Sequence, residues 1–107
     1  MPSNQVVIAT EPILRGIMEK EIDSLLEKEK LIVLVNSGKE FEPYISNEED
    51  FAFGMIIGII TEVLICRTLD RYNRRPTREE WKELRDILRR RTPEIKSKIS
   101  EALMMRP

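Results

Sequence analysis

The sequence predicts a single all-α domain over residues 1–107, in which four helices form a bundle-like fold around a central buried helix. Three observations lead to this prediction. Residues 51–69 are apolar around most of the circumference of a helix, whereas an amphipathic surface helix has a polar side. Other segments carry one apolar stripe at intervals of three and four residues, and residues typical of helix starts precede them.

A first helix is expected from Glu11 to about Lys30. Thr10 can cap its N-terminus, and Pro12 lies in the first turn, where its missing N–H breaks no hydrogen bond. The apolar stripe of this helix consists of Ile13, Leu14, Ile17, Met18, Ile22, Leu25 and Leu26. The preceding residues 1–9 contain a short apolar patch and could form a strand, a helical turn or an arm that docks on a partner.

Residues 31–35 are consecutive apolar residues and allow two interpretations. The helix could continue to Asn36 and end at Gly38, or residues 31–45 could form a hairpin, which would make the fold α+β. Pro43 would confine the returning strand to a sheet edge, and a lone hairpin has little else to pair with. The helix is therefore the favoured interpretation.

The central helix is expected from near Asn47 to about Arg74, because Pro76 forces it to end. Either Asn47 alone or Ser46 together with Glu49 can cap its start, since both arrangements offer an oxygen to the free N–H groups of the first turn. This helix would be about 40 Å long at 1.5 Å per residue.

Two further helices are predicted in the C-terminal third. Thr77 and Glu80 have the spacing of a capping box, and the helix that they start has one apolar face, formed by Trp81, Leu84, Ile87 and Leu88. Thr92 and Pro93 repeat the pattern of a helix start, so this helix is expected to end at residues 89–91 and a final helix to follow. The inward residues of the final helix are Ile95, Ile99, Ala102 and Leu103, and residues 104–107 are expected to form a frayed tail.

The composition is that of a globular chain, with 35% charged residues, no histidine and one cysteine. High charge, fourteen isoleucines and a single glutamine are typical of heat-adapted proteins. The N-terminus lacks the pattern of a signal peptide, and a cytoplasmic location is expected. Cys66 is expected to pack as a small hydrophobic side chain. Because Thr61 and Glu62 interrupt the apolar run, the central helix is expected to be buried in protein and not to span a membrane.

No motif for catalysis, cofactor binding or metal binding stands out. The sequence has no histidine to activate a nucleophile, no glycine-rich phosphate loop and no Cys-x-x-Cys pair. An enzyme is therefore not expected, and neither is a cofactor or a resident metal ion. The run Glu79, Glu80, Glu83 and Asp86 leaves a magnesium-dependent hydrolase as a third function, which would need a deep pocket lined by at least three carboxylates.

Charge is distributed unevenly along the chain. Residues 1–53 carry 5 basic and 11 acidic side chains, a net charge of −6, whereas residues 54–107 carry 13 and 8, a net charge of +5. An arginine-rich surface of the C-terminal half could bind nucleic-acid phosphates, which is the alternative function. Its candidate residues are Arg67, Arg71, Arg74, Arg75, Arg78, Arg89, Arg90 and Arg91. Interleaved acids equally fit an ordinary solvated surface.

The favoured function is a helical protein-interaction or assembly module without catalytic activity. A helix that is apolar on all sides needs cover on all sides, and the three other helices each offer only one stripe. A second copy could complete the cover by packing at Gly54 and Gly58, where the backbone of another helix can come close. Glu62 lies among apolar neighbours and is expected to pair with an arginine of another helix or another subunit. The sequence therefore predicts a homodimer with Gly54, Gly58 and Glu62 at its interface.

Overall fold

The computed structural model describes residues 12–105, which are helical apart from short connections. The elements are α1 (Pro12–Leu25), α2 (Lys28–Glu40), the short 3-10 helix η2 (Glu42–Tyr44), α3 (Glu48–Tyr72) and α4 (Arg78–Met105). This part of the chain contains no strand, which confirms the all-α prediction and excludes the hairpin at residues 31–45. The predicted arm at residues 1–9 lies outside the described residues.

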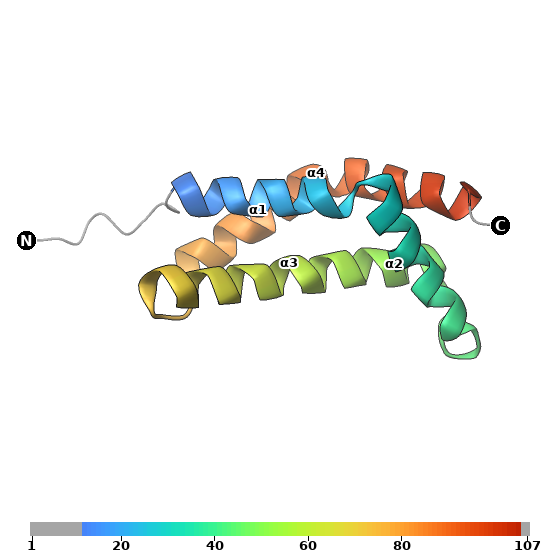
Figure 1. The fold of residues 1–107 in the computed structure, drawn as a ribbon, viewed down its shortest axis with the longest axis horizontal. Helices are drawn as coiled ribbons and strands as arrows, with labels where there is room; N and C mark the ends of the chain where they lie inside the picture. Colours follow the sequence, from blue (N-terminus) through green and yellow to red (C-terminus); the bar gives the residue numbers. More distant parts are fainter. Residues whose placement is uncertain (1–11, 106–107) are drawn as a thin grey trace, which may run out of the picture.

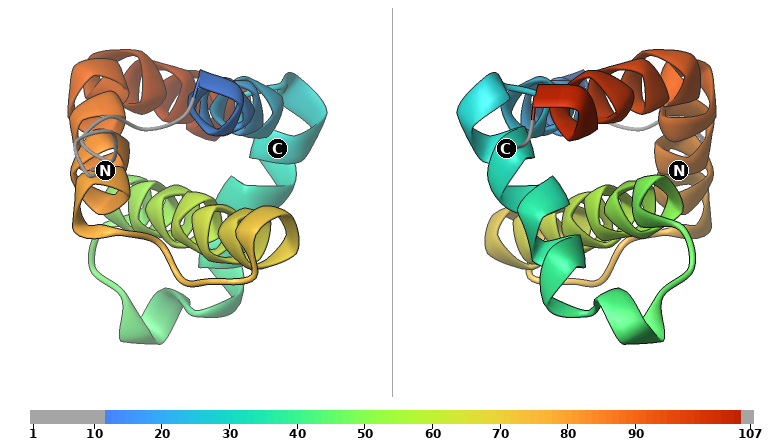
Figure 2. Two further views of the ribbon diagram at one scale, coloured as in Figure 1. Left: turned by 90° about the vertical axis from the view of Figure 1, so that its left-hand side faces the viewer. Right: turned by 90° about the vertical axis from the view of Figure 1, so that its right-hand side faces the viewer.

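The helices form a bundle in which α3 lies beneath α1 and the C-terminal half of α4 (Figure 1). Figure 2 shows α2 on one side of this arrangement and the N-terminal half of α4 on the other. The side of α3 that faces away from α1 and α4 has no helix along most of its length (Figure 2). This open side of the bundle is where the candidate functional site lies.

The core is formed by the apolar stripes of all four α-helices. Its fully or nearly fully buried side chains are Leu14, Met18, Ile22, Leu31, Val35, Ile56, Ile60, Leu64, Leu84, Ile87, Ile95 and Ile99. Thr68 continues the stripe of α3, and its hydroxyl donates to the carbonyl oxygens of Leu64 and Ile65, each at 3.0 Å. The buried hydroxyl is thereby satisfied within its own helix.

The predicted first helix is broken into two. It ends at Leu25, and α2 starts at Lys28 after an extended residue, Glu27. The apolar stripe explains the break, because Leu31 follows Ile22 by nine residues and, at about 100° per residue, would point opposite to it in one straight helix. The turn at residues 26–27 lets both stripes face the same core.

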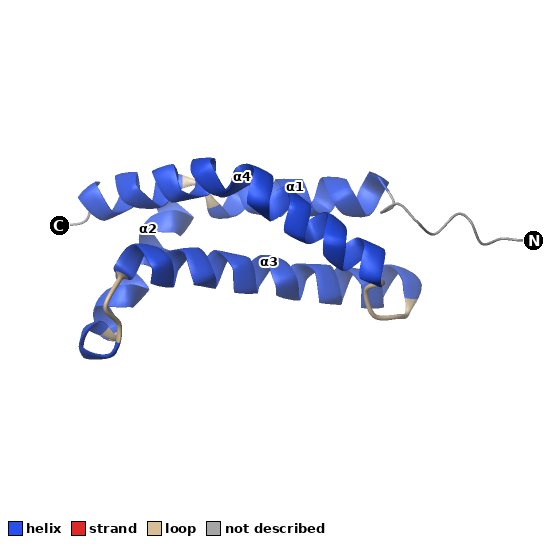
Figure 3. Ribbon diagram, turned by 180° about the vertical axis from the view of Figure 1, so that it is seen from behind, coloured by secondary structure: helices blue, strands red, loops and turns tan. Residues whose placement is uncertain are grey.

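The predicted boundary at Thr92 and Pro93 is wrong, because α4 runs through both residues as one helix. The Thr92 hydroxyl donates to the Leu88 carbonyl oxygen at 2.7 Å and does not cap a new helix. Pro93 removes one backbone hydrogen bond, and α4 bends near its middle (Figure 3). The helix also continues through Met104 and Met105, which were expected to fray.

Two predicted helix starts are confirmed. The Asn47 side chain caps α3 by accepting a hydrogen bond from the Asp50 N–H at 2.9 Å. Thr77 and Glu80 form the reciprocal capping box at the start of α4, with distances of 3.1 and 2.9 Å. At its other end α3 stops at Tyr72, because Asn73 adopts the left-handed conformation with φ of 54°.

Candidate functional site

The candidate site is the open face of α3, the side turned away from the core. The buried residues of this helix form one stripe at intervals of four, namely Ala52, Ile56, Ile60, Leu64 and Thr68. Only 28% of the most apolar 18-residue window of α3 is buried. The prediction of a helix covered on all sides therefore holds for one face only, because α1, α2 and α4 all pack on that face.

Gly54 and Gly58 lie in the middle of the open face. A Cβ atom built on either glycine would meet nothing within 4 Å, so no described residue packs against them. Half-buried Met55 and Ile65 and the 44%-exposed Leu69 add apolar surface elsewhere along the same helix. A solvated helix face normally carries polar side chains, so this face is the candidate interaction surface.

Aromatic side chains extend this surface at the N-terminal end of α3. The rings of Phe41 and Phe51 lie 6.1 Å apart in a tilted arrangement, and Phe41 is 50% exposed. Tyr44 of η2 is 84% exposed. Exposed aromatic residues are enriched at protein interfaces, because they combine a large apolar area with few rotatable bonds.

Glu62 and Cys66 also lie on the open face, one helical turn apart. The Cys66 thiol donates to the Glu62 carboxylate at 3.5 Å, and this hydrogen bond raises the pKa of the thiol. Glu62 forms no ion pair with any of residues 12–105, so its expected pairing within the chain is absent. The expectation that Cys66 is packed is wrong, because this side of α3 is uncovered and the thiol is exposed.

By length and composition α3 could cross a membrane, and it is the one helix among residues 12–105 of which this is true. The helix nevertheless packs its buried stripe against the core and carries charged groups tied to its neighbours. Lys96 of α4 donates to Asp50 at 2.9 Å, and Arg67 lies 3.8 Å from Glu21 of α1. These contacts hold α3 within the bundle.

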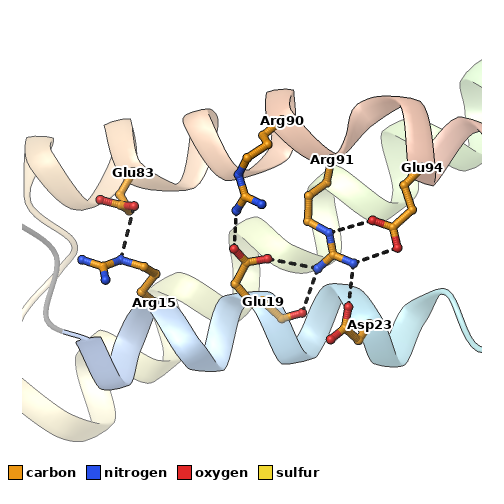
Figure 4. Close-up of polar contacts among 7 residues, drawn as sticks. All are labelled: Arg15, Glu19, Asp23, Glu83, Arg90, Arg91 and Glu94. Carbon is orange, nitrogen blue, oxygen red and sulfur yellow. Dashed lines mark hydrogen bonds and ion pairs between the residues drawn. The ribbon is translucent and has the colours of Figure 1, made fainter.

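Three of the eight candidate arginines, Arg67, Arg90 and Arg91, contact acidic residues of the N-terminal half. Arg91 is the centre of these contacts (Figure 4). Its guanidinium donates to Glu19 at 3.0 Å and to Asp23 at 2.6 Å, both on α1, and to Glu94 at 2.9 and 3.0 Å. Arg90 also pairs with Glu19. The acidic N-terminal half and the basic C-terminal half thus neutralise each other across the α1–α4 contact.

Two of the other candidate arginines hold the turn between α3 and α4. Arg74 forms a bidentate pair with Glu80 at 2.8 and 2.9 Å, and its guanidinium lies 4.8 Å from the centre of the Tyr72 ring. Arg71 lies on the same ring at 5.8 Å. The remaining candidates, Arg75, Arg78 and Arg89, are exposed. The eight candidate arginines therefore differ in their surroundings, and the proposed binding of phosphates by this set stays a prediction.

Replacing Arg91 by alanine is expected to lower the free energy of unfolding by about 2 kcal/mol, because several charge-assisted hydrogen bonds are lost from a side chain that is only 10% exposed. Urea unfolding measures the change. The matched control is Arg78→Ala on the same helix, since Arg78 is exposed and forms no hydrogen bond or ion pair with a described residue. Equal effects of the two substitutions would contradict the structural role of Arg91.

Three of the four acidic residues considered for a magnesium site each pair with a different basic side chain. Glu80 pairs with Arg74, Glu83 lies 3.4 Å from Arg15, and Asp86 accepts from Lys82 at 3.3 Å. A shallow hollow of about 260 Å³ is lined by Glu79, Lys82, Glu83 and Asp86, all from one helix. Among residues 12–105 no cluster of carboxylates and other ligands could hold a metal ion. The deep pocket that the hydrolase hypothesis needs is not found there.

Comparison with protein-family models, with curated proteins and with solved structures found no match to this chain.

Proposed function

We propose that the protein is a helical assembly module that forms a homodimer through the open face of α3 and has no catalytic chemistry of its own. The observation that carries this proposal is the open space at Gly54 and Gly58 on an apolar helix, where a Cβ atom would meet no described residue. Exposing such a face to water is unfavourable by about 25 cal/mol for each Å² of apolar surface. Association with a second copy would remove this cost.

The size of the face supports a moderate affinity. The 25 residues of α3 extend over about 37 Å at 1.5 Å per residue. A helix face of this length, widened at one end by Phe41 and Tyr44, falls at the small end of specific interfaces, which bury about 1,200–2,000 Å² in total. Interfaces at this end of the range are often transient, so we expect dilution in the micromolar range to separate the copies.

The reactivity of Cys66 tests the proposal at the face itself. Cys66 is the only cysteine, lies on the open face and is exposed in a single copy. We expect its reaction rate with a thiol reagent to fall as the protein concentration rises, because the second copy covers it. The same rate at all concentrations would contradict the proposal. The unfolded protein in guanidinium supplies the reference rate of a freely accessible thiol.

The membrane is the competing environment for this face. Flotation with lipid vesicles separates the two cases, since a dimer hides the face and stays in the soluble fraction. If the protein is recovered with the vesicles and has the mass of a single copy in buffer, the open face binds a membrane. That result would contradict the proposed self-association.

A further inference from the structure

We propose that the second copy docks antiparallel to the first, with the two α3 helices crossing at Gly58 and with Glu62 of each copy paired to Arg85 or Arg89 of the other. This inference rests on the proposed self-association through α3. It assigns a partner to the one charged side chain in the middle of the apolar face, and it specifies the orientation of the dimer.

The charge of Glu62 opposes a parallel dimer. Two parallel α3 helices that met along their glycines would place Glu62 of one copy directly against Glu62 of its partner. Neither carboxylate has an ion-pair partner within its own described chain, so two like charges would be desolvated together. The antiparallel arrangement moves them apart along the helices.

A groove lined by two arginines lies beside the open face. Its α3 residues precede Gly58 in the chain, whereas Glu62 follows Gly58. The groove has a volume of about 320 Å³ and an apolar floor formed by Phe53 and Ile57 of α3 and Leu88 of α4. Arg85 and Arg89 of α4 line it together with Thr92. Both arginines are exposed, and neither forms a hydrogen bond or an ion pair with another described residue. Two unpaired cations therefore border the same surface that carries an unpaired anion.

The register of an antiparallel crossing brings these charges together. Glu62 lies one turn after Gly58, about 6 Å along the helix axis at 1.5 Å per residue. An antiparallel partner that crosses at Gly58 places its Gly54 opposite Glu62, and this glycine leaves open space. Gly54 lies between Phe53 and Ile57 along α3, so Glu62 arrives at the level of the partner's groove. The pairing occurs twice, once for each Glu62, as two-fold symmetry requires.

Reversal of the charges tests this pairing. The substitution Glu62→Arg and the double substitution Arg85→Glu with Arg89→Glu are each expected to raise the dissociation constant of the dimer at least tenfold, because each places like charges opposite one another. The triple variant that combines them is expected to regain most of the affinity. Circular dichroism verifies that each variant remains helical. If the triple variant loses as much dimer affinity as the two separate variants lose together, the pairing is overturned. Self-association itself would not be contradicted by that result.

The distance between spin labels on Cys66 tests the orientation independently in the otherwise unchanged protein. Each Cys66 lies eight residues from Gly58, so an antiparallel dimer separates the two α-carbons by about 24 Å along the helices, at 1.5 Å per residue. A parallel dimer would place them within about 10 Å, the spacing of packed helices. A pulsed dipolar distance near the larger value is expected, and the shorter one would overturn the antiparallel orientation. Light scattering of the labelled protein verifies that it still forms the dimer, and a labelled dimer without coupling near the larger distance would equally overturn the antiparallel orientation.

Discussion

Replacing Glu80 by alanine is expected to lower the free energy of unfolding by about 2–3 kcal/mol, since a capping interaction and a bidentate ion pair are lost together. Glu80 is 5% exposed and accepts hydrogen bonds from the Thr77 N–H and from both terminal nitrogens of Arg74. The melting temperature should fall by roughly 10–20 °C for a domain of this size. Thermal unfolding at one fixed protein concentration measures the change.

The neighbouring substitution Glu79→Ala is the matched control for this prediction. Glu79 lies in the same first turn of α4 but is exposed, and it forms no hydrogen bond or ion pair with another described residue. Its removal should change the free energy of unfolding by no more than about 0.5 kcal/mol. If Glu79→Ala destabilised the protein as much as Glu80→Ala, the helix dipole and not the ion pair would be the source of the stability.

The same pair makes the stability depend on pH. The hydrogen bonds from Arg74 hold the pKa of Glu80 below its usual value, outweighing the opposite effect of burial. A carboxyl group whose pKa is lowered by folding contributes stability above its unfolded pKa, about 4.3, and loses that contribution as the pH falls through the folded value. Acid titration of unfolding should therefore destabilise the wild-type protein more steeply below about pH 4.3 than the Glu80→Gln variant.

Replacing Gly58 by arginine is expected to raise the dissociation constant of the homodimer at least 100-fold, which corresponds to about 2.8 kcal/mol at 1.4 kcal/mol for each factor of ten. A long charged side chain at the crossing point of two helices prevents their close approach and cannot be hydrated there. The substitution should leave the fold of the single copy intact, because a Cβ at this position meets nothing within 4 Å. Sedimentation equilibrium of the variant measures the loss.

Gly16→Arg is the control for the Gly58 substitution. Gly16 also lies in a helix, and a Cβ there also meets nothing within 4 Å, but it is in α1 and away from the open face. Both substitutions replace a poor helix former and should stabilise the single copy by up to about 1 kcal/mol. Only the Gly58 variant should lose the dimer. Dissociation by both would indicate a general effect of the added charge, and dissociation by neither would exclude α3 as the interface.

The number and type of the helices could be predicted from the sequence, but two boundaries could not be placed by capping residues alone. Thr92 and Pro93 have the residue types of a helix start, yet Leu88 and Ile95 lie on one continuous stripe at about 100° per residue, so α4 runs through them. Near Glu27 the helix does break, although no residue there is typical of a helix end or a helix start. The direction of the apolar stripe decides both cases, because it is what the core requires.

The surroundings of α3 could not be predicted, because apolar periodicity does not tell which side the rest of the chain covers. Cys66 and Leu64 belong to the same apolar segment, yet one is exposed and the other is fully buried. The contacts of the arginines could not be predicted either, because their partners lie far away along the chain. Arg91 meets Glu19 and Asp23 from 72 and 68 residues away, and only the opposite net charges of the two halves indicated such contacts.

The mass in solution tests the central claim most directly. Light scattering coupled to size-exclusion chromatography should give the mass of two 12.6 kDa chains at high concentration, falling towards that of one chain on dilution. The Gly58→Arg variant should have the single-chain mass throughout, and Gly16→Arg should behave as the wild type. A wild-type mass near 12.6 kDa at every micromolar concentration would contradict self-association through α3.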